Sequence, residues 1–169
     1  EPDRIALFGY AHVPWMKTHQ RMIDEASMPG IDERYAQARL AEDRLKAAGY
    51  AAIGIDHFAR ADDSLAMAAK EGLLKRNFQG YTDDPCEVLI GLGASSIGRL
   101  PQGYVQNIAA TGNYIAAVER GELPVAKGIA FADDDRLRGR VIELLMCDFS
   151  FSANELRAEF GEAAQVVVD

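Results

Sequence analysis

Two of the three histidines in this chain follow short apolar runs. His12 comes after the run at residues 5–8, and His57 comes after the run at residues 51–55, with Asp56 between them. Imidazole can accept or donate a proton near neutral pH, and ligands of open α/β sheets and barrels bind at the carboxyl ends of the strands. The spacing therefore indicates one ligand site near both histidines. The alternative is that each histidine is packed, with its ring nitrogens bonded to the backbone.

Three carboxylates lie close to His57 in the sequence. Neighbouring residues of an extended chain point to opposite faces, so a direct hydrogen bond between Asp56 and His57 is not expected. Asp62 and Asp63 could act together as catalytic carboxylates. In the first turn of a helix, however, such a pair more commonly complements the helix dipole. We expect this structural role for the pair.

The remaining candidates for a ligand or metal site are a loop of small residues and two cysteines. Gly91 and Gly93 leave room for a ligand to approach backbone amides, but the third glycine of a dinucleotide-binding pattern is missing. Cys86 and Cys147 are far apart in sequence and match no metal-ligand spacing, so we expect no zinc ion or cluster on them alone. Cys86 is expected to be a free thiol. No serine or cysteine lies in a nucleophile motif.

The elements that must position these residues alternate between strands and helices. Continuous apolar runs at residues 5–8, 51–55 and 88–92 are typical of buried parallel strands. Helical spacing extends over residues 32–48 and again after residue 62. This order of elements predicts an α/β fold with a parallel sheet.

The pattern changes after about residue 100. Helices are expected at residues 113–120, 134–147 and 153–160. The last two could imitate a helix-turn-helix, but their few arginines stand among many acidic residues, so a packed helical lobe is favoured. The sequence therefore predicts an α/β unit over residues 1–100 and an α-rich lobe over residues 101–169.

The charge of the chain argues against two classes of partner. Its 169 residues carry 18 Lys and Arg against 26 Asp and Glu, which gives a net charge of −8. Nucleic acids and anionic membranes attract cationic surfaces, so neither is an expected partner. No apolar run reaches the roughly 20 residues that span a membrane. Because no secretory leader is recognisable either, we expect a cytoplasmic protein.

Four strings of residues together carry a family resemblance. They are FGYAHVPW from Phe8, GIDHFARADD from Gly54, RNFQGYT from Arg76 and GLGASSIG from Gly91. They resemble oxygen-independent coproporphyrinogen III oxidase, a radical S-adenosylmethionine enzyme, and the resemblance thins after about Leu123. It implies strands of a partial parallel (β/α) barrel over residues 1–100, followed by the start of an α-rich C-terminal domain. Related haem chaperones, which bind and deliver haem, differ at the second and third strings and are the alternative.

The resemblance also implies a reaction. The family converts two propionates of coproporphyrinogen III to vinyl groups, which gives protoporphyrinogen IX. A 4Fe-4S cluster cleaves S-adenosylmethionine to a 5′-deoxyadenosyl radical, two S-adenosylmethionine molecules bind, and flavodoxin or ferredoxin supplies electrons. The protein positions the reactants and shields them from side reactions.

Site residues are carried over by position in the matching strings. Phe8 and Ala11 correspond to residues that line the second S-adenosylmethionine site, and Ile97 corresponds to a backbone contact of the first. Five further residues of the oxidase-specific strings are placed loosely on the substrate side: His57, Phe58, Asn77, Gln79 and Tyr81.

The family's cluster-binding cysteines, its catalytic tyrosine and a glutamate that binds S-adenosylmethionine are expected upstream of this chain. We therefore expect a segment of a longer enzyme that is inactive alone, binds no cluster and contributes no catalytic residue. Full-length members are expected to be monomers. The segment itself is expected to self-associate through the strand edge at residues 5–8, with Ile53, Ile55 and Leu89 exposed.

Overall fold

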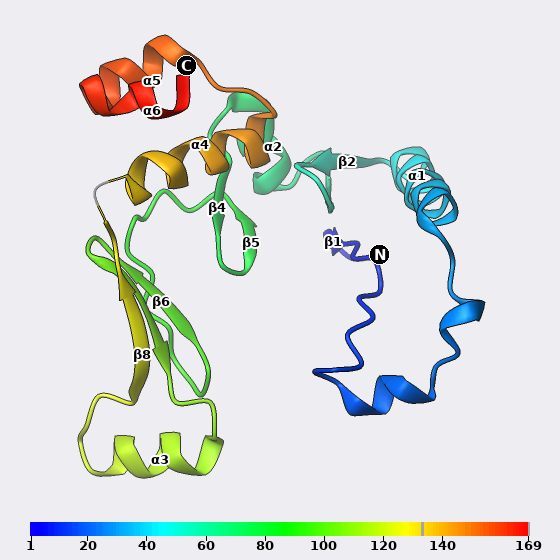
Figure 1. Ribbon diagram of the computed structural model, residues 1–169. Coiled ribbons are helices and arrows are strands. Elements are labelled where there is room, and N and C mark those ends of the chain that lie inside the picture. Colours follow the sequence, from blue (N-terminus) through cyan, green and yellow to red (C-terminus); the bar gives the residue numbers. More distant parts are fainter. Residues whose placement is uncertain (133, 169) are drawn as a thin grey trace. The chain divides into compact units, whose positions relative to one another are not determined.

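The structure, a computed structural model, describes residues 1–132 and 134–168 and divides into two units, Glu1–Leu74 and Lys75–Asp169 (Figure 1). Each unit combines helices with β-strands, which confirms the predicted α/β class. The division differs from the predicted boundary near residue 100, which falls in the turn of a β-hairpin.

The first unit is built on a three-stranded sheet of order β1-β3-β2. Its strands are β1 (Arg4–Ala6), β2 (Tyr50–Ile53) and β3 (His57–Arg60). Both β1 and β2 pair antiparallel with β3, so the two predicted strands share a direction but do not pair with each other. The prediction of direct parallel pairing is wrong here because Gly54, with a φ of 56°, turns the chain back at once. A parallel partner would need a much longer crossover.

The core of the first unit lies between this sheet and the helix α2 (Ser64–Glu71). Ile53 and Leu65 are each 1% exposed, and Phe58 is also buried. The expected exposure of Ile53 is therefore wrong, because α2 covers it, whereas Ile55 is exposed as predicted. The strand β1 lies at one edge of the sheet, and self-association through it stays a prediction.

The long helix α1 (Ile31–Ala47) has no buried residue in this unit. Glu42 stabilises it through ion pairs with Arg39 and Lys46, and these side chains are neighbours at three- and four-residue spacing. The helix begins one residue before the predicted start, and Gly30 is the residue before its first turn. Two short 3-10 helices precede it, Thr18–Met22 and Glu25–Ser27.

Asp63 joins the start of α2 to β1, which confirms its structural role. Its carboxylate accepts a hydrogen bond from the Leu65 amide at 2.8 Å and pairs with the Arg4 guanidinium at 2.9 Å. We expect Asp63→Ala to lower the free energy of unfolding by about 1–3 kcal/mol, because it removes both a helix cap and an ion pair. The matched control is Asp62→Ala, since Asp62 is exposed and its carboxylate lies 3.4 Å from the Arg60 guanidinium.

Urea unfolding of the whole chain measures both variants. The control should change the free energy of unfolding by about 0.5 kcal/mol or less. Equal effects of the two substitutions would contradict the capping role.

The second unit contains two antiparallel sheets. The strands β4 (Lys75–Asn77) and β5 (Gly80–Thr82) form a hairpin, and β6 (Ile97–Leu100), β7 (Gly103–Asn107) and β8 (Val125–Ala130) form a sheet in that order. The strand predicted at residues 88–92 is wrong, since there only Leu89 bridges to Arg99. Gly91 and Gly93 interrupt that run, and its large side chains are mostly exposed.

Helices complete the second unit, and the sequence predicts the first three of them. They are α3 (Thr111–Glu119), α4 (Asp135–Asp148), α5 (Ala153–Phe160), a 3-10 helix (Gly161–Ala164) and α6 (Gln165–Val168). Figure 1 shows α3 across the end of the sheet, between β7 and β8. Leu137 of α4 and Leu156 of α5 are each 1% exposed and pack with Ala164 in a small core. Among the described helices, none is long and apolar enough to cross a membrane.

Candidate functional site

The segment after β1 is held by a buried amide side chain. Gln20 is 9% exposed; its Oε1 accepts a hydrogen bond from the Val13 amide at 2.7 Å, and its Nε2 donates to the Ala11 carbonyl at 3.1 Å. Arg34 of α1 donates to the Tyr10 carbonyl at 2.9 Å. These bonds fix the backbone on both sides of Ala11, whose side chain stays exposed.

His12 has partners for both ring nitrogens. Nδ1 lies 3.1 Å from the Tyr10 hydroxyl, and Nε2 lies 3.1 Å from a Glu25 carboxylate oxygen. The His12 side chain is 14% exposed. It is therefore a satisfied, structural histidine, although its partners are side chains and not the predicted backbone groups.

His57 contacts the predicted cofactor residue Phe8. The two rings meet edge to face, with centroids 5.9 Å apart. His57 Nδ1 also lies 2.7 Å from a carboxylate oxygen of Asp56, so the expectation of no direct bond is wrong. The turn after Gly54 brings the two neighbouring side chains together, because the chain at Asp56 is not extended. Phe8 is 68% exposed, and the imidazole of His57 beside it is half-buried.

The glycine-rich loop before β6 is held by Asn107, which is 9% exposed. Its Nδ2 donates to the carbonyls of Gly91 at 2.9 Å and Gly93 at 3.0 Å. The Gly93 amide donates to the hydroxyl of Tyr114 at 3.0 Å. Gly93 has a φ of 100°, a conformation that side chains disfavour. The loop is therefore tied to both β7 and α3.

Ile97 presents its backbone at an edge of β6. On one side β6 pairs with β7, and on the other side the amide and carbonyl of Arg99 exchange hydrogen bonds with Leu89. Backbone groups alternate in direction along an antiparallel strand, so those of Ile97 face the same side as those of Arg99. Gly91 lies there, where a Cβ on it would stand 3.0–3.1 Å from Ile97 backbone atoms.

Asn107→Ala should loosen this loop. It leaves the carbonyls of Gly91 and Gly93 without their shared donor, and we expect a loss of about 2–3 kcal/mol in the free energy of unfolding. Hydrogen exchange should show faster exchange at the Gly93 amide. The control is Gln106→Ala, which removes one exposed hydrogen bond to the Ser95 carbonyl and should cost about 1 kcal/mol or less. Unchanged exchange at Gly93 in the Asn107 variant would contradict this role.

The β4–β5 hairpin carries three of the predicted substrate-side residues. The Gln79 amide donates to Asn77 Oδ1 at 2.8 Å across the turn, and the Gln79 side chain is exposed. Tyr81 is buried; its hydroxyl donates to the Met146 carbonyl at 3.0 Å, and the Arg76 guanidinium lies over its ring. Tyr81 therefore anchors the hairpin to α4. Phe58, which was also predicted on the substrate side, lies in β3 and is 4% exposed, so it is a core residue.

The structure places Phe8, Ala11 and His57 in the first unit, and Ile97 and the β4–β5 hairpin in the second. Within the first unit it joins Phe8 to His57. The sequence analysis missed Gln20, Asn107 and Tyr114, which hold the two loops. Their hydrogen bonds join residues that are seven to 21 positions apart in the sequence. No local sequence pattern predicts such bonds.

The described residues offer no cluster site. Among residues 1–132 and 134–168, no group of three or more His, Cys, Asp or Glu side chains could hold a metal ion. Cys86 is exposed and free, and a hydrogen bond to Asp84 raises the pKa of its thiol. Burial raises the pKa of the Cys147 thiol to about 11. These two thiols do not fit an iron–sulfur cluster, because they are far apart in sequence and the described residues bring no further ligands to either of them.

Known proteins match the chain along nearly its whole length. An oxygen-independent coproporphyrinogen III oxidase of Cereibacter sphaeroides is 55% identical over 99% of the chain, and one of Bradyrhizobium diazoefficiens is 50% identical over 99%. The chain is related to the oxygen-independent coproporphyrinogen III oxidase family. It spans 37% of the length of each of these two oxidases. No model of a known protein family matches the chain.

A solved oxidase shares the fold. A coproporphyrinogen III oxidase of Escherichia coli, described as a radical SAM enzyme, matches 95% of this chain with 37% identity and a TM-score of 0.84. This chain covers 37% of that structure. The predicted resemblance and fold class are thereby confirmed, and these relatives are named as oxidases and not as haem chaperones.

Proposed function

We propose that this chain is part of an oxygen-independent coproporphyrinogen III oxidase. That enzyme oxidatively decarboxylates two propionates of coproporphyrinogen III to vinyl groups, which gives protoporphyrinogen IX. The observation that carries the proposal is the 55% identity to a named oxidase over 99% of the chain. The likeness to the solved radical SAM enzyme supports it.

In this proposal the reactive group comes from cofactors bound with the help of other parts of the protein. S-adenosylmethionine and a 4Fe-4S cluster, when bound there, would supply the radical chemistry of the reaction. Two S-adenosylmethionine molecules bind, and flavodoxin or ferredoxin delivers the electron. The contribution of this chain is to bind, orient and shield the reactants.

Phe8 and Ala11 are proposed to line the second S-adenosylmethionine site. An exposed aromatic ring and a small side chain suit a flat, partly apolar ligand. The Gln20 bonds to the Ala11 carbonyl and the Val13 amide hold this segment in place. His57, itself bonded to Asp56, contacts the edge of the Phe8 ring and orients it.

Ile97 is proposed to contact the first S-adenosylmethionine through its backbone, which faces the edge of β6 opposite β7. Asn77 and Gln79 are proposed to face the substrate from the turn of the β4–β5 hairpin. The Gln79 amide bond to Asn77 shapes that turn, and the Tyr81 bond to Met146 ties the hairpin to α4. Tyr81 then supports the hairpin and does not touch the substrate, and Phe58 is a core residue of the first unit.

Anaerobic turnover tests the proposal. The full-length oxidase that contains this chain, reconstituted with iron and sulfide, should convert coproporphyrinogen III to protoporphyrinogen IX when S-adenosylmethionine and reduced flavodoxin are present. Omission of S-adenosylmethionine is the control and should leave the substrate intact. A protein that binds haem and leaves the substrate unchanged in the complete mixture would contradict it.

A further inference from the structure

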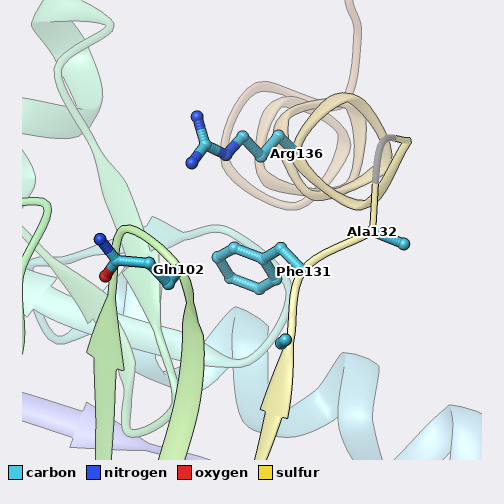
Figure 2. A pocket seen from close by; sticks show the side chains of 5 residues that line it. Gln102, Phe131, Ala132 and Arg136 are labelled. Atoms are coloured by element: carbon cyan, nitrogen blue, oxygen red, sulfur yellow. The ribbon is translucent and has the colours of Figure 1, made fainter.

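A hollow of about 470 Å³ lies in the second unit, where the β6–β7 turn meets the start of α4. Its lining combines one guanidinium, one amide and apolar groups: Arg136, Gln102, Ala130, Phe131 and Ala132. Figure 2 shows the Arg136 side chain extending from α4 above the Phe131 ring, and Gln102 on the β6–β7 turn with its amide group directed away from that ring. The hollow is therefore cationic at one side and apolar at the other.

A backbone carbonyl orients the guanidinium of Arg136, and the two neighbouring carboxylates, Asp134 and Asp135, are bonded to other groups. Arg136 Nη2 donates to the Pro101 carbonyl at 2.8 Å, which directs the guanidinium to the β6–β7 turn. Asp134 pairs with Arg138 at 2.6 Å, and Asp135 accepts a hydrogen bond from the Ala132 amide at 2.7 Å. Both carboxylates thus have other partners, and Arg136 keeps donors for an anion.

An aromatic ladder joins the hollow to the β4–β5 hairpin. The Phe131 ring meets the Tyr104 ring edge to face at 5.1 Å, and the Tyr104 ring meets the Phe78 ring in the same way at 4.7 Å. Phe78 stands between Asn77 and Gln79, the proposed substrate-side residues. The three rings thus form a chain of contacts from the hairpin to the hollow, which Arg136 also lines.

We propose that this hollow binds a carboxylate of the substrate, a propionate of coproporphyrinogen III, with Arg136 and Gln102 as donors and the aromatic ladder against the tetrapyrrole. The inference rests on the proposed function and adds a subsite to it. A guanidinium binds a carboxylate through two parallel hydrogen bonds, and apolar walls accommodate the aliphatic arm that carries it.

The same carboxylate chemistry could come from the methionine part of S-adenosylmethionine. There the carboxylate stands next to an ammonium group, which Arg136 repels. A propionate has no such neighbour, and its ring system suits the aromatic ladder. The propionate is therefore the favoured ligand, and the experiment separates the two.

Equilibrium binding to the full-length oxidase tests the subsite, with coproporphyrin III as the probe and its tetramethyl ester as the uncharged control. Arg136→Ala should raise the Kd for coproporphyrin III about tenfold or more and leave the Kd for the ester unchanged. Arg136→Lys should restore part of the affinity. Arg138→Ala, on the same helix, should leave both Kd values unchanged.

Three results would overturn the subsite. They are an unchanged Kd for coproporphyrin III in Arg136→Ala, an equal loss for the ester, and a loss of affinity for S-adenosylmethionine in place of coproporphyrin III. The proposed function fails separately, if the unmodified oxidase does not convert coproporphyrinogen III. Circular dichroism of each variant shows whether the fold is kept.

Discussion

Ala11→Trp in the full-length oxidase should lower turnover of coproporphyrinogen III by at least about a hundredfold while the iron–sulfur absorbance stays unchanged. The reason is steric: Ala11 is exposed, and its backbone is held by the Gln20 bond to its carbonyl. An indole in place of the methyl group would fill the proposed second S-adenosylmethionine site, and even small displacements of reactants cost large factors in rate.

Ala61→Trp is the matched control, since Ala61 is also exposed in the first unit and lies outside the proposed site. It should keep near-normal turnover. The thermal unfolding midpoints of both variants should stay close to that of the unmodified protein. Near-normal turnover in Ala11→Trp would show that the assignment of this position is wrong.

Gly103→Ala should lower the free energy of unfolding of the whole chain by about 3–5 kcal/mol. Gly103 begins β7 with a φ of 152°. A Cβ there would overlap the Ile129 carbonyl oxygen and stand 2.9 Å from the Ala130 Cα. Both are backbone atoms of β8, so β7 and β8 would have to separate. Urea unfolding monitored by circular dichroism measures the loss.

Gly112→Ala provides the control for that substitution. Gly112 lies in α3, and a Cβ on it would meet nothing within 4 Å. Alanine should there stabilise the helix by about 0.5–1 kcal/mol. If both glycine variants unfold at the same urea concentration, the close approach of β7 and β8 does not limit stability.

The helices could be predicted from the sequence because their signals are local. The helix predicted at residues 153–160 matches α5, where the Ser152 hydroxyl accepts a hydrogen bond from the Glu155 amide. The helix predicted at residues 134–147 matches α4 within one residue at each end. Periodic apolar residues and a capping residue lie within a few positions of each other, so a short window contains the whole signal.

Strand pairing could not be predicted in the same way. β3 carries polar residues at both ends, His57 and Arg60, and no continuous apolar run marks it. The turn at Gly54 decides that β3 folds back between β1 and β2. An apolar run alone does not show which strand it pairs with or in which direction.

The residues of the candidate site were named from the family resemblance. The contacts that hold them in place join residues that are distant in sequence. Phe8 and His57 are distant in sequence, but the structure puts their rings in contact. Nothing in the sequence distinguishes Asn107 and Gln20 from other polar residues. Their importance follows from their burial and hydrogen bonds in the structure. Buried amides take partners that the fold brings to them, and sequence spacing does not encode those partners.

The most direct test of the central claim follows one hydrogen atom. Coproporphyrinogen III that carries deuterium at the β-carbons of its propionates is incubated without oxygen with the full-length oxidase, S-adenosylmethionine and reduced flavodoxin. We expect protoporphyrinogen IX and 5′-deoxyadenosine that contains deuterium, as mass spectrometry can show. Unlabelled 5′-deoxyadenosine, or intact substrate, would contradict the claim that this chain belongs to a radical decarboxylating oxidase.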